Sequence, residues 1–111
     1  MKKKIYIDFD GVLNTYTGWQ GNTELFEPHA GAEKFLRKLS RTYEIYIFST
    51  RNPLLVAEWL TKHDLREYIS GVTNVKEPAY VYIDDRAINF AGNYEEILDK
   101  LEKFEVWWKK R

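Results

Sequence analysis

The sequence predicts an α/β fold, a three-layer α/β/α sandwich in which a mainly parallel β-sheet lies between two layers of helices. Short apolar runs rich in β-formers alternate along the chain with longer segments whose apolar residues recur at helical spacing. Such alternation is typical of parallel sheets, because parallel strands need a crossover connection that is usually a helix. At 111 residues, 44% of them hydrophobic, the chain is long enough for one core. We therefore expect a single domain over residues 1–111.

The first element expected is a buried strand that ends near Asp8. Its run IYIDFDGV starts with Ile5 and Ile7 and then changes to two carboxylates, Asp8 and Asp10, and a glycine. A long irregular loop is expected over residues 14–28, which are rich in Gly and Asn and end at a Pro. Loops of that length in a small domain often carry function.

The middle of the chain predicts a helix, a strand and a second helix. From Gly31 onward the apolar residues have helical spacing, and basic residues gather toward the end of that segment, as the helix dipole favours. The run EIYIFST predicts a second strand over residues 44–48, followed by two hydroxyl residues. Asn52 is expected to cap the next helix, with Pro53 at its first position.

The last third predicts a weak element, a clear strand and a final helix. ISGVTN is a weak strand or a turn, and YVYIDD is a strand that again ends in two carboxylates. Asn93 is expected to cap the final helix, whose apolar positions keep the helical period as far as Trp108. Of the adjacent Trp107 and Trp108, we expect one in the core and one on the surface.

Charge and cysteine content exclude several classes of protein. The chain has 17 basic and 17 acidic residues, so its formal net charge of zero creates no overall field for nucleic acid or an anionic membrane. The absence of cysteine excludes a disulfide scaffold, a thiolate metal site and a cysteine nucleophile. The apolar run after MKKK is far shorter than a signal peptide or a membrane span, so we expect a soluble cytoplasmic protein.

Polar residues with chemical potential follow each clearly predicted strand. Because parallel strands all end at one edge of the sheet, where ligands of such sheets bind, these side chains are expected to meet. They are Asp8 and Asp10, Ser49 and Thr50, and Asp84 and Asp85, with Lys76 in the loop before the last strand. Converging carboxylates repel one another, and all-oxygen ligation suits Mg²⁺. Together with Lys76, a hydroxyl and the backbone N–H groups of the loop around Gly11, the metal would suit a phosphoryl group.

The order of these motifs resembles the haloacid dehalogenase (HAD) superfamily of phosphotransferases. An apolar strand followed by D-x-D-G-V, a Ser or Thr closing the second strand, a later Lys and a strand ending in D-D occur in that order between Asp8 and Asp85. The resemblance implies a Rossmann-like sheet and a Mg²⁺-dependent phosphohydrolase, a phosphatase that works through an aspartyl phosphate. The intervals between the motifs are too short for a cap domain, so the resemblance is to a capless member.

The resemblance also implies a role for each matched residue. Asp8 would be the nucleophile that becomes phosphorylated. Asp10 would be the general acid and then the general base, with its backbone carbonyl on Mg²⁺. Asp84 would join these two as a Mg²⁺ ligand, with Asp85 beside it. Lys76 would neutralise the charge of the nucleophile and the phosphoryl group.

Two assignments stay open between alternatives. Ser49 would hydrogen-bond a phosphoryl oxygen, but a shift of one residue at the strand end would give that role to Thr50. Trp19 either covers the site as a flap that contacts substrate or anchors the loop over residues 14–28 on the core.

A second class of function stays open as well, a non-catalytic phosphoryl-accepting or phosphate-sensing module of the response-regulator receiver type. A receiver shares the open α/β sheet and Mg²⁺, but its phospho-acceptor Asp follows a middle strand, whereas the middle strand here ends in Ser49. The expected partner is a phosphorylated substrate, small or macromolecular, and not a membrane; nucleic acid and oligomerisation stay open. Our hypothesis is a large substrate, because a large partner can close a capless site with its own surface.

Overall fold

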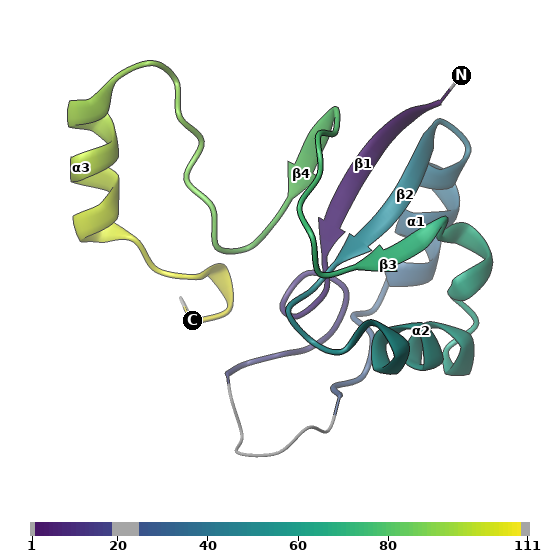
Figure 1. Cartoon of the computed structure of the whole chain (residues 1–111). Helices are drawn as coiled ribbons and strands as arrows, with labels where there is room; N and C mark the ends of the chain where they lie inside the picture. The colour runs from purple at the N-terminus through teal and green to yellow at the C-terminus, as the bar shows by residue number, and fades with distance from the viewer. Residues whose placement is uncertain (1, 19–24, 110–111) are drawn as a thin grey trace.

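Four strands pair into one parallel sheet, and the first strand along the chain is one of its two central strands. The computed structural model describes residues 2–18 and 25–109. Within them the strands follow the order β3-β2-β1-β4, and every neighbouring pair is parallel (Figure 1). Their bounds are β1 Lys3–Asp8, β2 Tyr43–Phe48, β3 Gly71–Thr73 and β4 Val81–Ile83. The predicted strands are therefore confirmed, including the weak one in ISGVTN.

In the described part of the chain, three α-helices and two short 3₁₀ helices connect and follow the strands. Their bounds are α1 Ala32–Ser40, α2 Pro53–Lys62, η1 Arg66–Tyr68, α3 Tyr94–Lys103 and η2 Trp107–Lys109. The two predicted caps are confirmed. The Asn52 side chain accepts the Leu54 N–H at 2.9 Å, and the Asn93 side chain accepts the Glu96 N–H at 3.1 Å. Each bond satisfies a backbone donor that the first turn of a helix leaves free.

Helices α1 and α2 bury one face of the sheet. The side chains of Ile5 and Ile7 in β1 and of Ile45 and Ile47 in β2 form one fully buried cluster with residues of both helices. Alternate residues of a strand point to the same face, which is why these positions act together. Phe9, just past β1, joins the same core, and its position after Asp8 begins the turn that carries the polar residues.

Aromatic rings cover the opposite face of the sheet. The centroid of the Tyr6 ring lies 5.7 Å from the ring centroid of Tyr46, 6.5 Å from that of Phe48 and 5.6 Å from that of Tyr82. The ammonium group of Lys4 lies 4.7 Å from the Tyr46 ring centroid. These contacts leave Tyr6 only 2% exposed, although α1 and α2 pack on the other face.

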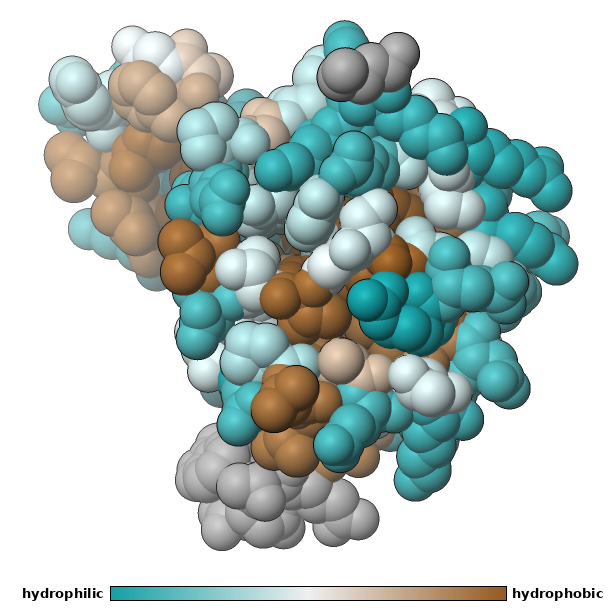
Figure 2. Space-filling model, turned by 45° about the vertical axis from the view of Figure 1, so that its right-hand side comes forward, coloured by the Kyte–Doolittle hydropathy of each residue, from teal (hydrophilic) through white to brown (hydrophobic). Residues whose placement is uncertain are grey.

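Helix α3 is set apart from the sheet, beyond β4 (Figure 1). Its apolar stripe is largely open, with Leu98 59% and Leu101 58% exposed, and Figure 2 shows apolar side chains gathered over this part of the surface. The radius of gyration, 14.9 Å, accordingly exceeds the value of about 13 Å typical of a 100-residue domain. The expectation that one helix reaches Trp108 is wrong: α3 ends at Lys103, because Phe104 has extended backbone angles, and Trp108 lies in η2.

The predicted α/β class, with a parallel Rossmann-like sheet flanked by helices, is confirmed. Within the described ranges, each helix is too short or too polar to cross a lipid bilayer.

Helix α2 offers a matched test of the buried face. Replacing Leu60, which is fully buried, by Ala should reduce the free energy of unfolding by about 2–5 kcal/mol, because it removes apolar contacts and leaves a cavity. Leu54→Ala in the same helix is the control, since Leu54 is 72% exposed and its loss should change stability by no more than about 0.5 kcal/mol. Urea unfolding at equilibrium measures both values, and equal losses would contradict the placement of α2.

Candidate active site

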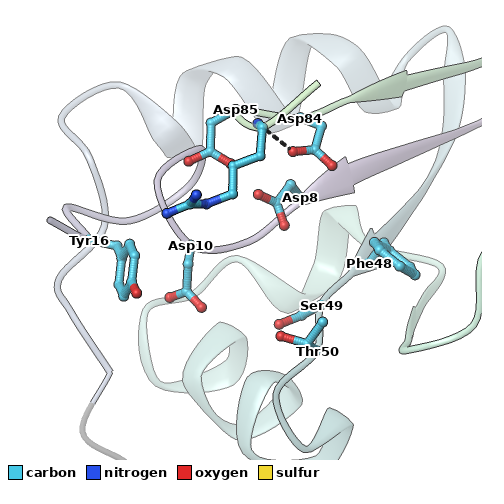
Figure 3. Close-up of a pocket in the computed structure, with 9 residues that line it drawn as sticks. Asp8, Asp10, Tyr16, Phe48, Ser49, Thr50, Asp84 and Asp85 are labelled. Atoms are coloured by element: carbon cyan, nitrogen blue, oxygen red, sulfur yellow. Dashed lines mark hydrogen bonds between the residues drawn. The ribbon is translucent and has the colours of Figure 1, made fainter. Parts of the chain in front are cut away.

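Parallel pairing of β1 with β4 brings distant carboxylates together. Ile7 is opposite Ile83 in the sheet, so the next residues, Asp8 and Asp84, leave the two strands side by side. Carboxylate oxygens of Asp8, Asp84 and Asp85 all lie within 4.8 Å of one another. Figure 3 shows the three groups converging at the end of β1.

Most of the residues predicted for the site line one cavity, of about 240 Å³, at this edge of the sheet. Its lining comprises Asp8, Asp10, Tyr16, Phe48, Ser49, Thr50, Asp84, Asp85 and Arg86 (Figure 3). Both candidate hydroxyl residues are among them, so the cavity alone does not choose between the two. Ser49 is 3% exposed and its Oγ accepts the Arg51 N–H at 3.1 Å, whereas Thr50 is exposed.

Burial and the crowding of negative charge are both visible in the pKa of Asp8. Burial, a hydrogen bond with Asp85 and the charges of Asp84 and Asp85 together raise that pKa to about 8, against a lowering by a hydrogen bond from the Phe9 backbone. A bound cation would favour the charged form of all three groups instead. This donor set, three carboxylates with no nitrogen or sulfur ligand, fits Mg²⁺. Asp8, Asp84 and Asp85 are therefore the side chains that could hold the metal.

Asp10 is held outside this cluster by two side chains that the sequence analysis did not identify. Arg51 Nε donates to one of its carboxylate oxygens at 2.6 Å, and Asn14 Nδ2 donates to the other at 2.9 Å. Asn14 is fully buried, and its Oδ1 accepts the backbone N–H groups of Gly11 and Tyr16, each at 3.1 Å. The side chain of Asp10 is thus not placed with the other predicted Mg²⁺ ligands.

Sequence signals existed for both partners of Asp10. Asn is a frequent turn former whose side chain accepts backbone N–H groups, and Asn14 lies soon after a glycine at a strand end. Arg51 directly follows the two candidate hydroxyl residues. Their orientation toward Asp10 depends on contacts between separate segments, which a pattern of residue types does not encode.

Lys76 lies beside the predicted site rather than in the same cavity. It lines a neighbouring space of about 150 Å³ together with Asp8, Phe48 and Asp84. Its ammonium group lies 4.6 Å from the centroid of the Tyr82 ring, a cation–π contact. Trp19, the predicted flap residue, lies outside the described residues.

Gly11 and the two final tryptophans form a further part of the site. Gly11 has a φ of +83°, which favours glycine, and its N–H is already bonded to Asn14 rather than free for a phosphoryl oxygen. The indole of Trp107 donates to the Gly11 carbonyl at 3.0 Å, and that of Trp108 donates to Asp85 Oδ2 at 2.7 Å. As expected, one of the two tryptophans is buried and the other is partly exposed, but both bind site residues.

Comparison with known proteins supports the fold and gives no information about the chemistry of the site. No protein-family model matches the chain, and no curated protein matches it. A solved structure of a conserved protein coded by a locus from Bacteroides thetaiotaomicron is similar, with a TM-score of 0.61. That chain is 18% identical, and the match covers 96% of this chain and 95% of that one. At this identity the likeness shows the fold alone.

The raised pKa of Asp8 predicts an unusual dependence of stability on pH in the metal-free chain. Between the unfolded pKa of 3.8 and the folded pKa of about 8, the folded state binds a proton that the unfolded state releases, so stability falls as pH rises. Asp8→Asn does not titrate. Its melting temperature should therefore match that of the unmodified chain near pH 4 and exceed it increasingly toward pH 8, measured in EDTA.

Asp64→Asn serves as the control for this measurement, because Asp64 is exposed in the turn after α2, away from the cluster. It should not reproduce the growing difference. A constant difference for Asp8→Asn across this pH range would contradict the raised pKa of Asp8.

Proposed function

We propose that this protein is a Mg²⁺-dependent phosphohydrolase that works through a phosphorylated Asp8. The observation that carries the proposal is the convergence of Asp8, Asp84 and Asp85 oxygens within 4.8 Å, beside a cavity that Ser49 and Asp10 also line. The order of these residues along the chain is the one that resembles the HAD superfamily. The order of the motifs and the position of their side chains thus support the same chemistry.

Mg²⁺ would be held by Asp8, Asp84 and Asp85. When bound, it would neutralise charge on the phosphoryl oxygens and so allow an anionic nucleophile to approach an anionic substrate. The charge of the metal would offset the burial and the neighbouring negative charges that raise the pKa of Asp8, and so would keep that side chain ionised at neutral pH. Ionisation matters because only the carboxylate is a competent nucleophile.

Asp8 then acts as the nucleophile. One of its oxygens forms a bond to phosphorus as the bond from phosphorus to the leaving oxygen breaks, and the leaving oxygen takes a proton from Asp10. In the second half of the reaction a water attacks the aspartyl phosphate, Asp10 accepts its proton, and inorganic phosphate leaves. The two halves balance to hydrolysis of one phosphate ester.

Arg51 holds Asp10 in the structure and would release it during this cycle. The two side chains form an ion pair, with Arg51 Nε 2.6 Å from Asp10 Oδ2. A phosphate ester entering the cavity would compete with Asp10 for the guanidinium, since phosphate and carboxylate are both bidentate partners of Arg. Release from Arg51 would let the Asp10 side chain turn toward the leaving oxygen.

Lys76 and Ser49 complete the proposed phosphoryl site. Ser49 has a hydroxyl hydrogen still available to a phosphoryl oxygen, because its bond with the Arg51 N–H uses the oxygen as acceptor. The ammonium group of Lys76 would leave the Tyr82 ring and turn toward the phosphoryl group from the adjacent cavity.

The proposed substrate carries its phosphate on a large molecule. The cavity is small, and the described residues form no cap domain over this edge of the sheet. A small ester would gain little binding energy away from the phosphoryl group, whereas a macromolecule would exclude water with its own surface.

Replacing Asp8 by Asn should abolish turnover of phosphate esters, by roughly 10³-fold or more, with the fold intact, because an amide is not a nucleophile. Phosphate release with Mg²⁺ and with EDTA measures this, first with p-nitrophenyl phosphate and then with phosphorylated peptides and oligonucleotides. Asp99→Asn, on the exposed surface of α3, is the matched control and should retain activity. Comparable activity in Asp8→Asn would remove the nucleophile from the proposal.

Asp10→Asn should separate the two half-reactions. With the general base removed, the aspartyl phosphate should persist, so acid-quenched protein should retain radioactive phosphate after incubation with a labelled ester. Labelling of the unmodified chain without any turnover would instead favour the receiver-like, phospho-accepting alternative.

Mg²⁺ should raise the melting temperature of the chain, because it binds the folded cluster and has no comparable site in the unfolded state. At a concentration one hundred times its Kd, the stabilisation should be about 2.7 kcal/mol. Asp84→Ala should lose most of this response, and the same titration on Asp99→Asn should show it in full. An unchanged melting curve for the unmodified chain across millimolar Mg²⁺ would contradict the metal site.

A further inference from the structure

The last turn of the chain reaches the acidic cluster from the opposite end of the sequence. Helix η2, Trp107–Lys109, packs against the turn that follows β1, and Trp108 is 4% exposed there. Its indole N–H donates to Asp85 Oδ2 at 2.7 Å. Nothing in the motifs around Asp8 or Asp84 requires a tryptophan at this position.

The Trp108 ring is fixed on several sides. Tyr16 packs against it edge to face with the ring centroids 5.5 Å apart. The guanidinium of Arg86 lies 5.6 Å from its ring and the ammonium of Lys109 5.5 Å. A donor held by this many contacts has little rotamer freedom left to lose, so its hydrogen bond directs the Asp85 carboxylate rather than following it.

Gly11 shows how tightly this contact is built. A Cβ on Gly11 would clash with Asp85 Oδ2 and would lie 2.8 Å from Trp108 Nε1. Trp107 Nε1 meanwhile donates to the Gly11 carbonyl at 3.0 Å. The turn after β1, the carboxylate after β4 and the end of the chain therefore pack together with no space for one more carbon atom.

We propose that Trp108 is a positioning residue that holds the Asp85 carboxylate in the cluster with Asp8 and Asp84. An unsupported Asp85 would be repelled by its two neighbours and would turn toward solvent. The neutral indole N–H fixes one oxygen of Asp85 and leaves the negative charge of the carboxylate in place. A Lys or Arg partner would cancel that charge. The cluster thus keeps both its geometry and the negative charge that a divalent cation requires.

This inference rests on the proposed function in one respect, that the cluster binds Mg²⁺. The test compares Mg²⁺ affinity, measured by calorimetry on the full chain, for Trp108→Phe and the unmodified chain. Trp108→Phe keeps an aromatic ring and removes the donor, and it should weaken Mg²⁺ binding by roughly 10-fold or more. Equal affinity of the two chains would overturn the proposal.

Trp59→Phe is the matched control. Trp59 is also buried, 5% exposed, and its indole donates to the Phe26 carbonyl at 2.8 Å, on the helical face of the sheet. It should lose stability as Trp108→Phe does while binding Mg²⁺ as the unmodified chain does. If both variants weakened Mg²⁺ equally, loss of stability would explain the effect and the positioning role would be excluded.

A double-mutant cycle isolates the contact itself. In an Asp85→Ala background, Trp108→Phe should cause no further loss of Mg²⁺ affinity, because the group it positions is absent. The same additional loss as in the unmodified background would overturn the proposal.

Gly11→Ala and Gly31→Ala provide a second, independent pair. Both glycines have positive φ, +83° and +88°, so both variants carry similar backbone strain. Only the new Cβ of Gly11→Ala meets Asp85 and Trp108, since Gly31 has open space. Gly11→Ala should therefore weaken Mg²⁺ binding more, and equal effects would count against the packed contact.

The indole N–H resonance of Trp108 separates failure of this inference from failure of the proposed function. Measured by NMR without metal, it should shift strongly in Asp85→Ala and little in Asp64→Ala. If the resonance responds but the unmodified chain binds no Mg²⁺, the metal site fails, and with it any positioning for a metal. If Mg²⁺ binds but the Trp108 resonance does not shift in Asp85→Ala, the contact is absent and only this inference fails.

Discussion

The parallel register between β1 and β4 is the constraint on which the site depends. These strands lie far apart in the chain, yet the pairing of Ile7 with Ile83 delivers Asp8 and Asp84 to the same point. Hydrophobic burial of β1 beneath α1 and α2 fixes which residues of that strand point inward, and so fixes where the strand ends relative to its neighbours. A register shift of one residue would separate the two carboxylates and turn the core positions outward.

Among the described residues, no salt bridge joins a cation to Asp8, Asp84 or Asp85, and the nearby cations contact other groups. Arg51 is paired with Asp10, the Lys76 ammonium lies over Tyr82, and the Arg86 guanidinium lies over a tryptophan ring. The result is a partly exposed pocket of carboxylates instead of an internal network of salt bridges, and the burial of Asp8 together with its hydrogen bond to Asp85 and the neighbouring charges raises the pKa of Asp8. A folded chain can hold such a pocket because the remaining packing stabilises it, and a divalent cation is the partner that would relieve it.

Helix α3 shows where a prediction from local pattern differs from the result of tertiary packing. Its period and its Asn93 cap were sufficient to predict a helix, because both depend on neighbours within one turn. The pattern also predicted continuation to Trp108, but the chain leaves the helix at Phe104 and carries the tryptophan to the site. Periodicity does not distinguish an apolar residue that extends a helical stripe from one that packs against a different element.

The sequence by itself determined the order in which polar motifs follow the strands along the chain, the helix caps and the set of carboxylates, because each depends on residue type and short spacing. Only the tertiary structure decided which of these groups contact one another. It placed Asp10 with Arg51 and Asn14 instead of with the other carboxylates, and it set Trp108 against Asp85. Those contacts join segments that are distant along the chain, and their geometry follows from how the sheet, its turns and the chain end pack together in three dimensions.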